Sequence, residues 1–175
     1  MRKQQAALGS AMFFLVAPCV VAGLVPWWIT GWSPPDLPFW LGASTIVVGF
    51  GLMVGGVVLL VRAFARFVNE GRGTPAPVAP TERLVVGGEY RFVRNPMYVG
   101  VEAIILGQAA LFWSAPLVLY SLVSWLGMAA FVRWYEEPVL RSRYGVEYDT
   151  YRRAVRGWWP RLRPWDPSRA AGTNS

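Results

Sequence analysis

The sequence contains no histidine and one cysteine, Cys19, which lies inside an apolar run. A disulfide within the chain is therefore excluded, and so are zinc sites built from Cys and His. Nucleophilic triads that need a histidine base are excluded on the same ground. The sequence also has no P-loop and no dinucleotide-binding G-x-G-x-x-G motif. We expect no metal site and none of the common soluble nucleotide-binding folds.

Charged residues are scarce as well. They make up 15% of the chain, whereas an ordinary soluble domain has about 25%. Hydrophobic residues make up 54%, and ten are tryptophan. The net charge of +7 could indicate a nucleic-acid partner, but the arginines flank long apolar runs. This pattern favours charge at a membrane surface, and no nucleic-acid partner is expected.

Four apolar segments have lengths close to the ~20 residues that cross a bilayer. They cover residues 6–29, 39–61, 97–113 and 115–135. The first is longer than the ~7–15 apolar residues of a signal peptide, so we expect a retained helix. The third is short for a span and carries an acidic residue, Glu102.

The positive charges agree with four spans. Of the 17 Lys and Arg residues, two precede the first segment, six lie between the second and third, and nine lie from Arg133 onward. Four spans place all 17 on one side of the membrane. The positive-inside rule then predicts that both termini are cytoplasmic.

We therefore predict an all-α, polytopic transmembrane bundle of about four spans with a cytoplasmic, amphipathic C-terminal helix. That helix is expected over residues 139–155, because apolar and aromatic side chains recur there at helical spacing. They are Leu140, Tyr144, Tyr148, Tyr151 and Val155. Pro138 disfavours helix at Glu137, so a break or bend is expected there.

The expected division is a two-span hairpin at 1–68, a catalytic region at 69–165 and a disordered tail at 166–175. Residues 69–96 are expected to form a long cytoplasmic loop, rich in Gly and Pro over its first part. Within the second span, Gly49, Gly51, Gly55 and Gly56 are expected to allow close helix packing.

Three groups could carry chemistry at the cytoplasmic rim. Asn95-Pro96 is a helix-start signal, and a helix N-terminus beside Arg91 and Arg94 would suit an anion, although it could equally be a basic anchor for the third span. Glu136-Glu137 could bind a cationic group or pair with Arg133, Arg94 or Arg141. Glu102, an intramembrane carboxylate, is a functional candidate by default, with snorkelling or an arginine partner as the alternative.

The run Arg94-Asn95-Pro96-Met97-Tyr98-Val99-Gly100, followed by two apolar helices and Glu136-Glu137, resembles the isoprenylcysteine carboxyl methyltransferase family and the related phospholipid N-methyltransferases. That family carries Arg-His-Pro-x-Tyr-x-Gly, a hydrophobic stretch and Glu-Glu. The segments around Gly73-Thr74-Pro75 and Tyr144-Gly145 match its flanking patterns as well. The resemblance covers about residues 70–163, and the short chain is similar to bacterial-type members.

The resemblance implies a multi-pass protein of the bacterial inner membrane that uses S-adenosylmethionine in a cytoplasmic pocket, with a lipophilic acceptor entering from the bilayer. Arg94, Asn95 and Glu102 would be catalytic. The donor-binding residues would be Tyr90, Pro96, Tyr98, Gly100, Glu136, Glu137, Tyr148, Tyr151 and Arg161. Asn95 replaces the histidine of the eukaryotic enzymes and cannot take a proton at neutral pH, so this position is not expected to act as a base.

Carboxylate O-methylation is the favoured reaction, because a carboxylate is already ionised near neutral pH and needs no base. The alternatives are N-methylation of a phospholipid amine, a nicotinamide-dependent membrane reductase and a non-enzymatic membrane protein such as an assembly factor or small transporter. The polar residues gather at one rim rather than near the midplane, which argues against a transporter.

Overall fold

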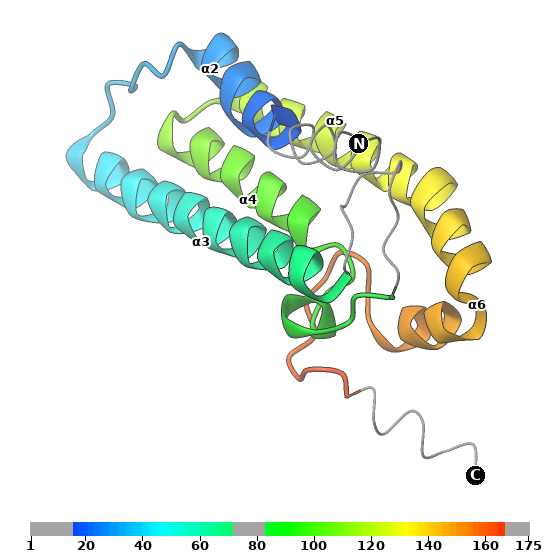
Figure 1. Ribbon diagram of the computed structural model, residues 1–175. Helices are drawn as coiled ribbons and strands as arrows, with labels where there is room; N and C mark the ends of the chain where they lie inside the picture. Colours follow the sequence, from blue (N-terminus) through cyan, green and yellow to red (C-terminus); the bar gives the residue numbers. More distant parts are fainter. Residues whose placement is uncertain (1–15, 72–82, 167–175) are drawn as a thin grey trace. The chain divides into compact units, whose positions relative to one another are not determined.

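The computed structural model describes residues 16–71 and 83–166. Within these ranges the chain forms helices and no strand, which confirms the all-α prediction. The helices are η1 (Val20–Leu24), α2 (Val25–Thr30), α3 (Phe39–Gly71), η2 (Gly88–Arg91), α4 (Pro96–Leu111), α5 (Ala115–Phe131), η3 (Val132–Glu136) and α6 (Glu137–Ala154) (Figure 1). The expected Gly/Pro-rich segment at residues 73–80 and nearly all of the C-terminal tail lie outside the described residues.

Two helical stretches are long and apolar enough to cross a membrane. They run over Phe39–Glu70 and Ala115–Ala154. Only 17% of the most apolar window of each is buried within the chain, whereas the core helix of a soluble protein would be mostly covered. Their apolar side chains therefore suit a lipid environment.

The other two apolar helices are shorter. Val16–Thr30 and Pro96–Leu111 have 15 and 16 residues, and 16 residues span about 24 Å, which is less than a hydrocarbon core of about 30 Å. Residues 6–15 of the first expected span lie outside the described part of the chain. The two long helices are thus established, while the count of four spans stays a prediction.

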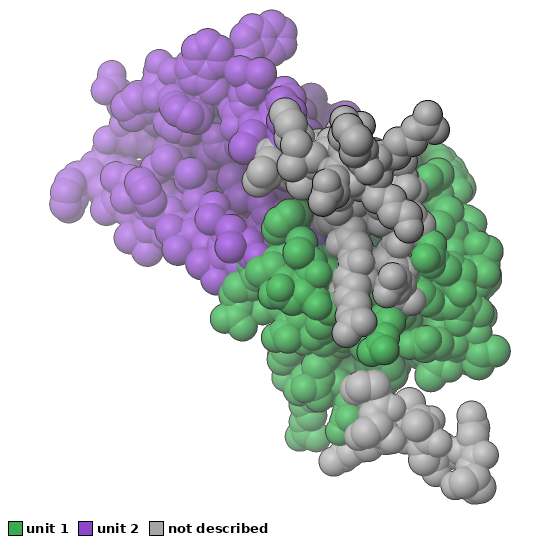
Figure 2. Space-filling model, in the orientation of Figure 1, with its two compact units in different colours: residues 1–11, 62–96, 130–175 green, residues 12–61, 97–129 purple. Residues whose placement is uncertain are grey.

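The chain divides into two compact units, which Figure 2 colours separately. One unit consists of residues 12–61 and 97–129, and it holds α2, α4, α5 and most of α3. The other consists of residues 1–11, 62–96 and 130–175, and it holds the end of α3, η2, η3, α6 and the C-terminal segment.

In unit 2 of Figure 2, residues 12–61 and 97–129, α3 and α4 pack closely through glycines spaced seven residues apart on each helix. A Cβ on Gly49 would lie 2.8 Å from the carbonyl oxygen of Gly107, and a Cβ on Gly56 would lie 2.6 Å from that of Gly100. Such backbone contact is possible only between small residues. The packing role expected for Gly49 and Gly56 is confirmed, whereas Gly51 and Gly55 have no neighbour within 4 Å of a built Cβ.

In unit 1 of Figure 2, α6 packs its predicted apolar face. Tyr148, Tyr151 and Val155 are buried together, and Leu140 and Tyr144 pack against them. The residues that the periodicity placed on one face are therefore buried together, while the cytoplasmic position of this helix stays a prediction.

The sequence predicted a break or bend at Glu137, and the helix does not break there. Glu137 has helical angles (φ −60°, ψ −43°), and its N–H bonds to the carbonyl of Val132 in the π turn η3. The wider π turn admits the Pro138 ring without ending the helix. The irregular backbone lies instead at Gly145, whose φ of 51° and ψ of −123° suit glycine alone.

Candidate functional site

The site is built on a turn that the end of α3 holds in place. Glu70 Oε2 accepts a hydrogen bond from the Gly87 N–H at 3.1 Å, and Arg62 pairs with Glu89 at 2.5 Å. Gly88 follows with a φ of +53°, which a glycine adopts without strain. Burial alone would raise the pKa of Glu89, but the hydrogen bond and charge of Arg62, with the charge of Arg66, lower that pKa below its usual value. The anchored turn η2 then leads directly into residues 91–95.

Residues 91–95 lie along the segment that follows α6. Backbone hydrogen bonds run from Arg94 N–H to Arg156 O (2.9 Å), from Asn95 N–H to Gly157 O (3.2 Å), from Arg161 N–H to Phe92 O (2.9 Å) and from Trp165 N–H to Arg91 O (3.0 Å). These bonds fix the Arg94-Asn95 backbone against α6 and the residues after it.

Arg94 is the centre of a buried polar network. Its Nη1 donates to Glu137 Oε1 at 3.1 Å and to the Tyr148 hydroxyl at 3.0 Å. Arg152 Nη2 lies 3.0 Å from the other Glu137 oxygen. The side chains of Arg94 and Glu137 are only 13% and 10% exposed, so this ion pair is largely shielded from water.

Two hydrogen-bond donors of this network have no partner among the described residues. They are Arg94 Nε and Asn95 Nδ2, and both are buried. Gly157 lies beside them, since a Cβ there would come within 3.2 Å of Arg94 Nη2 and 3.4 Å of Asn95 Nδ2. A buried donor without a partner is costly. These two N–H donors are therefore suited to donate hydrogen bonds to oxygens or ring nitrogens of a bound molecule.

The tyrosines of the site are neutral at physiological pH. Burial raises the pKa of Tyr148, and the charge of Arg94 offsets only part of that rise. Burial likewise raises the pKa values of Tyr90 and Tyr151. The Tyr151 hydroxyl donates to Tyr90 O at 2.7 Å, which joins α6 to the η2 turn.

The structure thus brings together most of the predicted rim residues: Tyr90, Arg94, Asn95, Glu137, Tyr148 and Tyr151. Arg161 has a supporting place, because its Nη1 donates to Ala154 O at the end of α6 at 2.7 Å. Glu136 is half-buried next to this network, and its side chain has interacting partners.

The remaining predicted residues lie on α4. Pro96 begins this helix, Tyr98 is in its first turn, and Gly100 faces the Gly56 backbone of α3. Glu102 is buried and accepts a hydrogen bond from the Ser121 hydroxyl of α5 at 2.5 Å. Glu102 therefore has a serine as hydrogen-bond partner, and the arginine partner that the sequence allowed as one alternative is not observed among the described residues.

Arg152 and Gly157 were missed by the sequence reasoning. Arg152 follows Glu137 by 15 residues and is one of several arginines in α6, so nothing local linked it to Glu137. The only signal for Gly157 is a small residue directly before Trp158-Trp159.

One carboxylate, Glu137, therefore lies between two guanidinium groups at the centre of the site, which leaves the cluster with surplus positive charge. Arg94 bonds to one oxygen of Glu137, and Arg152 forms an ion pair with the other. Arg152 lies 3.0 Å from Glu137 Oε2 without a hydrogen bond to it, so this oxygen, like the donors of Arg94 and Asn95, is available to a bound molecule.

Comparison with curated protein sequences and with solved structures gave no match. A family model described as phospholipid methyltransferase matches residues 44–147, which is more than half of the 175 residues. The matched range includes Arg94, Asn95 and Glu137 and ends just before Tyr148. The chain therefore belongs to the phospholipid methyltransferase family, within the superfamily of membrane methyltransferases that resemble isoprenylcysteine carboxyl methyltransferase.

Proposed function

We propose that the protein is an integral-membrane, S-adenosylmethionine-dependent methyltransferase that acts on a lipophilic acceptor. The observation that carries the proposal is the buried Arg94 network. It combines a neutralised arginine–glutamate pair with two unpartnered donors, within the range that the methyltransferase family model matches.

The residues at this network fit the polar parts of the donor. Arg94 Nε and Asn95 Nδ2 would donate to its carboxylate, ribose hydroxyl or adenine acceptors. Tyr148, neutral and already bonded to Arg94, would keep the guanidinium in place. S-adenosylmethionine supplies a methyl group on a sulfonium when bound, so the chain has to orient the two partners and exclude water.

Carboxylate O-methylation remains the preferred reaction. The acceptor oxygen would form the new O–CH3 bond with its own lone pair, while the electrons of the broken S–CH3 bond stay on sulfur. No proton has to be moved, which suits a site whose Glu137 is engaged by two arginines. The second candidate is methylation of a phospholipid amine, which the description of the matched family favours. That reaction releases a proton and needs a base.

We also propose that the site faces the cytoplasm of a bacterial cell. Its residues belong to the arginine-rich segments at 62–94 and 133–169, and the positive-inside rule places such segments on the cytoplasmic side.

Label transfer tests the reaction. The purified protein is incubated with methyl-labelled S-adenosylmethionine and a lipid extract of its native host, and labelled lipids are identified by mass spectrometry. Mild alkali then separates the two candidates, because a methyl ester is hydrolysed to methanol and an N-methyl group is stable. Label in an alkali-labile lipid supports O-methylation. Alkali-stable label supports the amine reaction, and absence of label in any lipid contradicts the proposal.

A further inference from the structure

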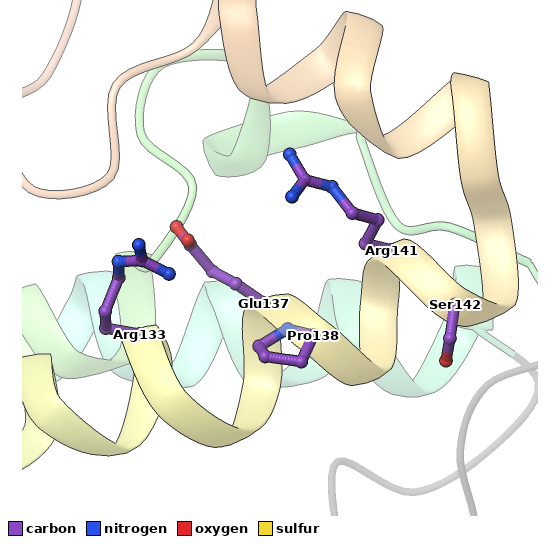
Figure 3. Close-up of a pocket in the computed structure, with 5 residues that line it drawn as sticks. All are labelled: Arg133, Glu137, Pro138, Arg141 and Ser142. Atoms are coloured by element: carbon purple, nitrogen blue, oxygen red, sulfur yellow. The ribbon is translucent and has the colours of Figure 1, made fainter.

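A pocket opens on the α6 side of Glu137. It has a volume of about 310 Å³ and is lined by Arg133, Glu137, Pro138, Arg141 and Ser142 (Figure 3). This volume is at the lower end of the range for small-molecule sites, large enough for a headgroup. In Figure 3 the side chains of Arg133, Glu137 and Arg141 extend from one face of the helix.

The pocket carries surplus positive charge. Its one carboxylate, Glu137, is already bound by Arg94 and Arg152. None of the ion pairs formed by the described residues includes Arg133. Arg133 therefore offers a guanidinium to the pocket that Glu137 does not neutralise.

Arg141 can add a second guanidinium. Its Nε lies 2.9 Å from Asp149 Oδ1, but the two side chains are 55% and 37% exposed. An exposed ion pair of this kind contributes little stability, so Arg141 can exchange Asp149 for another anion at little cost. A single guanidinium can bind a phosphate or carboxylate through two parallel hydrogen bonds, so two of them suit an anionic group.

The residues beside the pocket suit the membrane interface. Trp134 is 79% exposed, and Tyr135, stacked on Phe131, is 43% exposed. They follow the apolar α5 helix directly. Exposed Trp and Tyr at the end of an apolar helix are typical of the headgroup level of a bilayer, where a lipid can enter sideways.

We infer that this pocket binds the anionic group, phosphate or carboxylate, of a lipid acceptor, with Arg133 as the principal contact and Arg141 as the second. The inference rests on the proposed function, because the acceptor is defined by the proposed methyl transfer. The acceptor would be an anionic amphiphile that binds next to Glu137. The same helix, α6, also carries Tyr148 of the proposed donor site.

Binding of matched amphiphiles tests the inference without turnover. The protein in dodecyl maltoside is titrated with dodecyl phosphate, dodecanoate and dodecyltrimethylammonium, and bound molecules are counted by native mass spectrometry. We expect saturable binding of one molecule of either anion and none of the cation. Arg133→Gln should weaken anion binding about tenfold, the loss of one charged hydrogen bond, while Arg133→Lys retains most of it.

Arg163→Gln is the matched control, because Arg163 is exposed and lies outside the pocket lining. Equal weakening by Arg133→Gln and Arg163→Gln would show general charge attraction and overturn the inference, as would equal binding of the cation. Inorganic phosphate that binds as tightly as dodecyl phosphate would show a soluble-anion site and overturn the lipid assignment.

A parallel titration with S-adenosylhomocysteine separates this inference from the proposed function. Binding of S-adenosylhomocysteine without binding of either anionic amphiphile is consistent with the proposed function but overturns the assignment of the pocket. Binding of the amphiphile alone overturns the acceptor role.

Discussion

Arg94 Nη1 donates a hydrogen bond to Glu137 Oε1 at 3.1 Å, although 43 residues separate the two in the chain. Both side chains are largely buried, and Tyr148 and Arg152 complete their contacts. The pair ties the residues before α4 to α6, so the site depends on it for its geometry and for its charge balance.

Replacing Glu137 by Gln should damage both stability and ligand binding. The substitution keeps the shape but leaves Arg94 and Arg152 facing each other without a countercharge. Removing one partner of a buried pair typically costs about 3 kcal/mol. We expect a lower melting temperature in detergent and at least about tenfold weaker binding of S-adenosylhomocysteine by calorimetry.

Glu147→Gln provides the control, since Glu147 is exposed on the same helix. It should leave both measurements unchanged. If Glu137→Gln binds as tightly as the wild type, the Arg94 network is not the donor site.

Gly56→Ala should destabilise the α3–α4 contact. A Cβ there would lie 2.6 Å from the Gly100 carbonyl oxygen, so the helices must separate. Overpacking of this kind costs about 1–3 kcal/mol, which outweighs the helix propensity gained by alanine. Gly55→Ala is the neighbouring control, with open space around the new methyl group. Equal thermal stability of the two variants would mean that α3 and α4 do not meet at Gly56.

Gly145→Ala should strain α6 without any steric clash. A Cβ there has no neighbour within 4 Å, but φ is +51° and ψ is −123°. Such a backbone conformation costs a non-glycine residue about 1–3 kcal/mol. Gly127→Ala, which also has open space but no positive φ, should be tolerated. Circular dichroism melts of both variants compare them directly, and a fully stable Gly145→Ala would mean that α6 is not kinked there.

Acid should weaken the anchor of the η2 turn. The pKa of Glu89 is lower in the folded chain than its ordinary value of 4.5. Its contribution to stability is therefore present above that ordinary value and is lost as the pH falls through the lower folded pKa. Between about pH 6 and pH 3 the wild type should lose more stability than Glu89→Gln, which cannot titrate. Parallel pH dependences of the two melting temperatures would exclude this role for Glu89.

The spacing of apolar residues predicted those helices that bury one face and expose the other. Leu140, Tyr144, Tyr148, Tyr151 and Val155 were identified because burial selects apolar side chains at helical spacing. The same spacing cannot reveal the kink at Gly145. A helix tolerates a single glycine, and the sequence does not show whether that glycine has a helical or a positive φ. Pro138 suggested an interruption that the helix does not have at Glu137. The π turn that accommodates the proline ring cannot be recognised from the neighbouring residues in the sequence.

The site was predictable as a set of residues but not as a network. Arg94 and Glu137 stood out because charged groups at the end of apolar helices are costly without a purpose. Arg152 could not be distinguished from the other arginines of α6, since its partner is chosen by tertiary packing. Gly100 belongs to the same motif as Arg94, yet it contacts the Gly56 backbone, so one motif holds both packing and ligand-facing positions.

Calorimetric titration of the detergent-purified wild-type protein with S-adenosylhomocysteine tests the central claim most directly, with NADPH as the comparison ligand. We expect saturable binding of one S-adenosylhomocysteine per chain and no binding of NADPH. Absence of S-adenosylhomocysteine binding by folded wild-type protein would contradict the central claim.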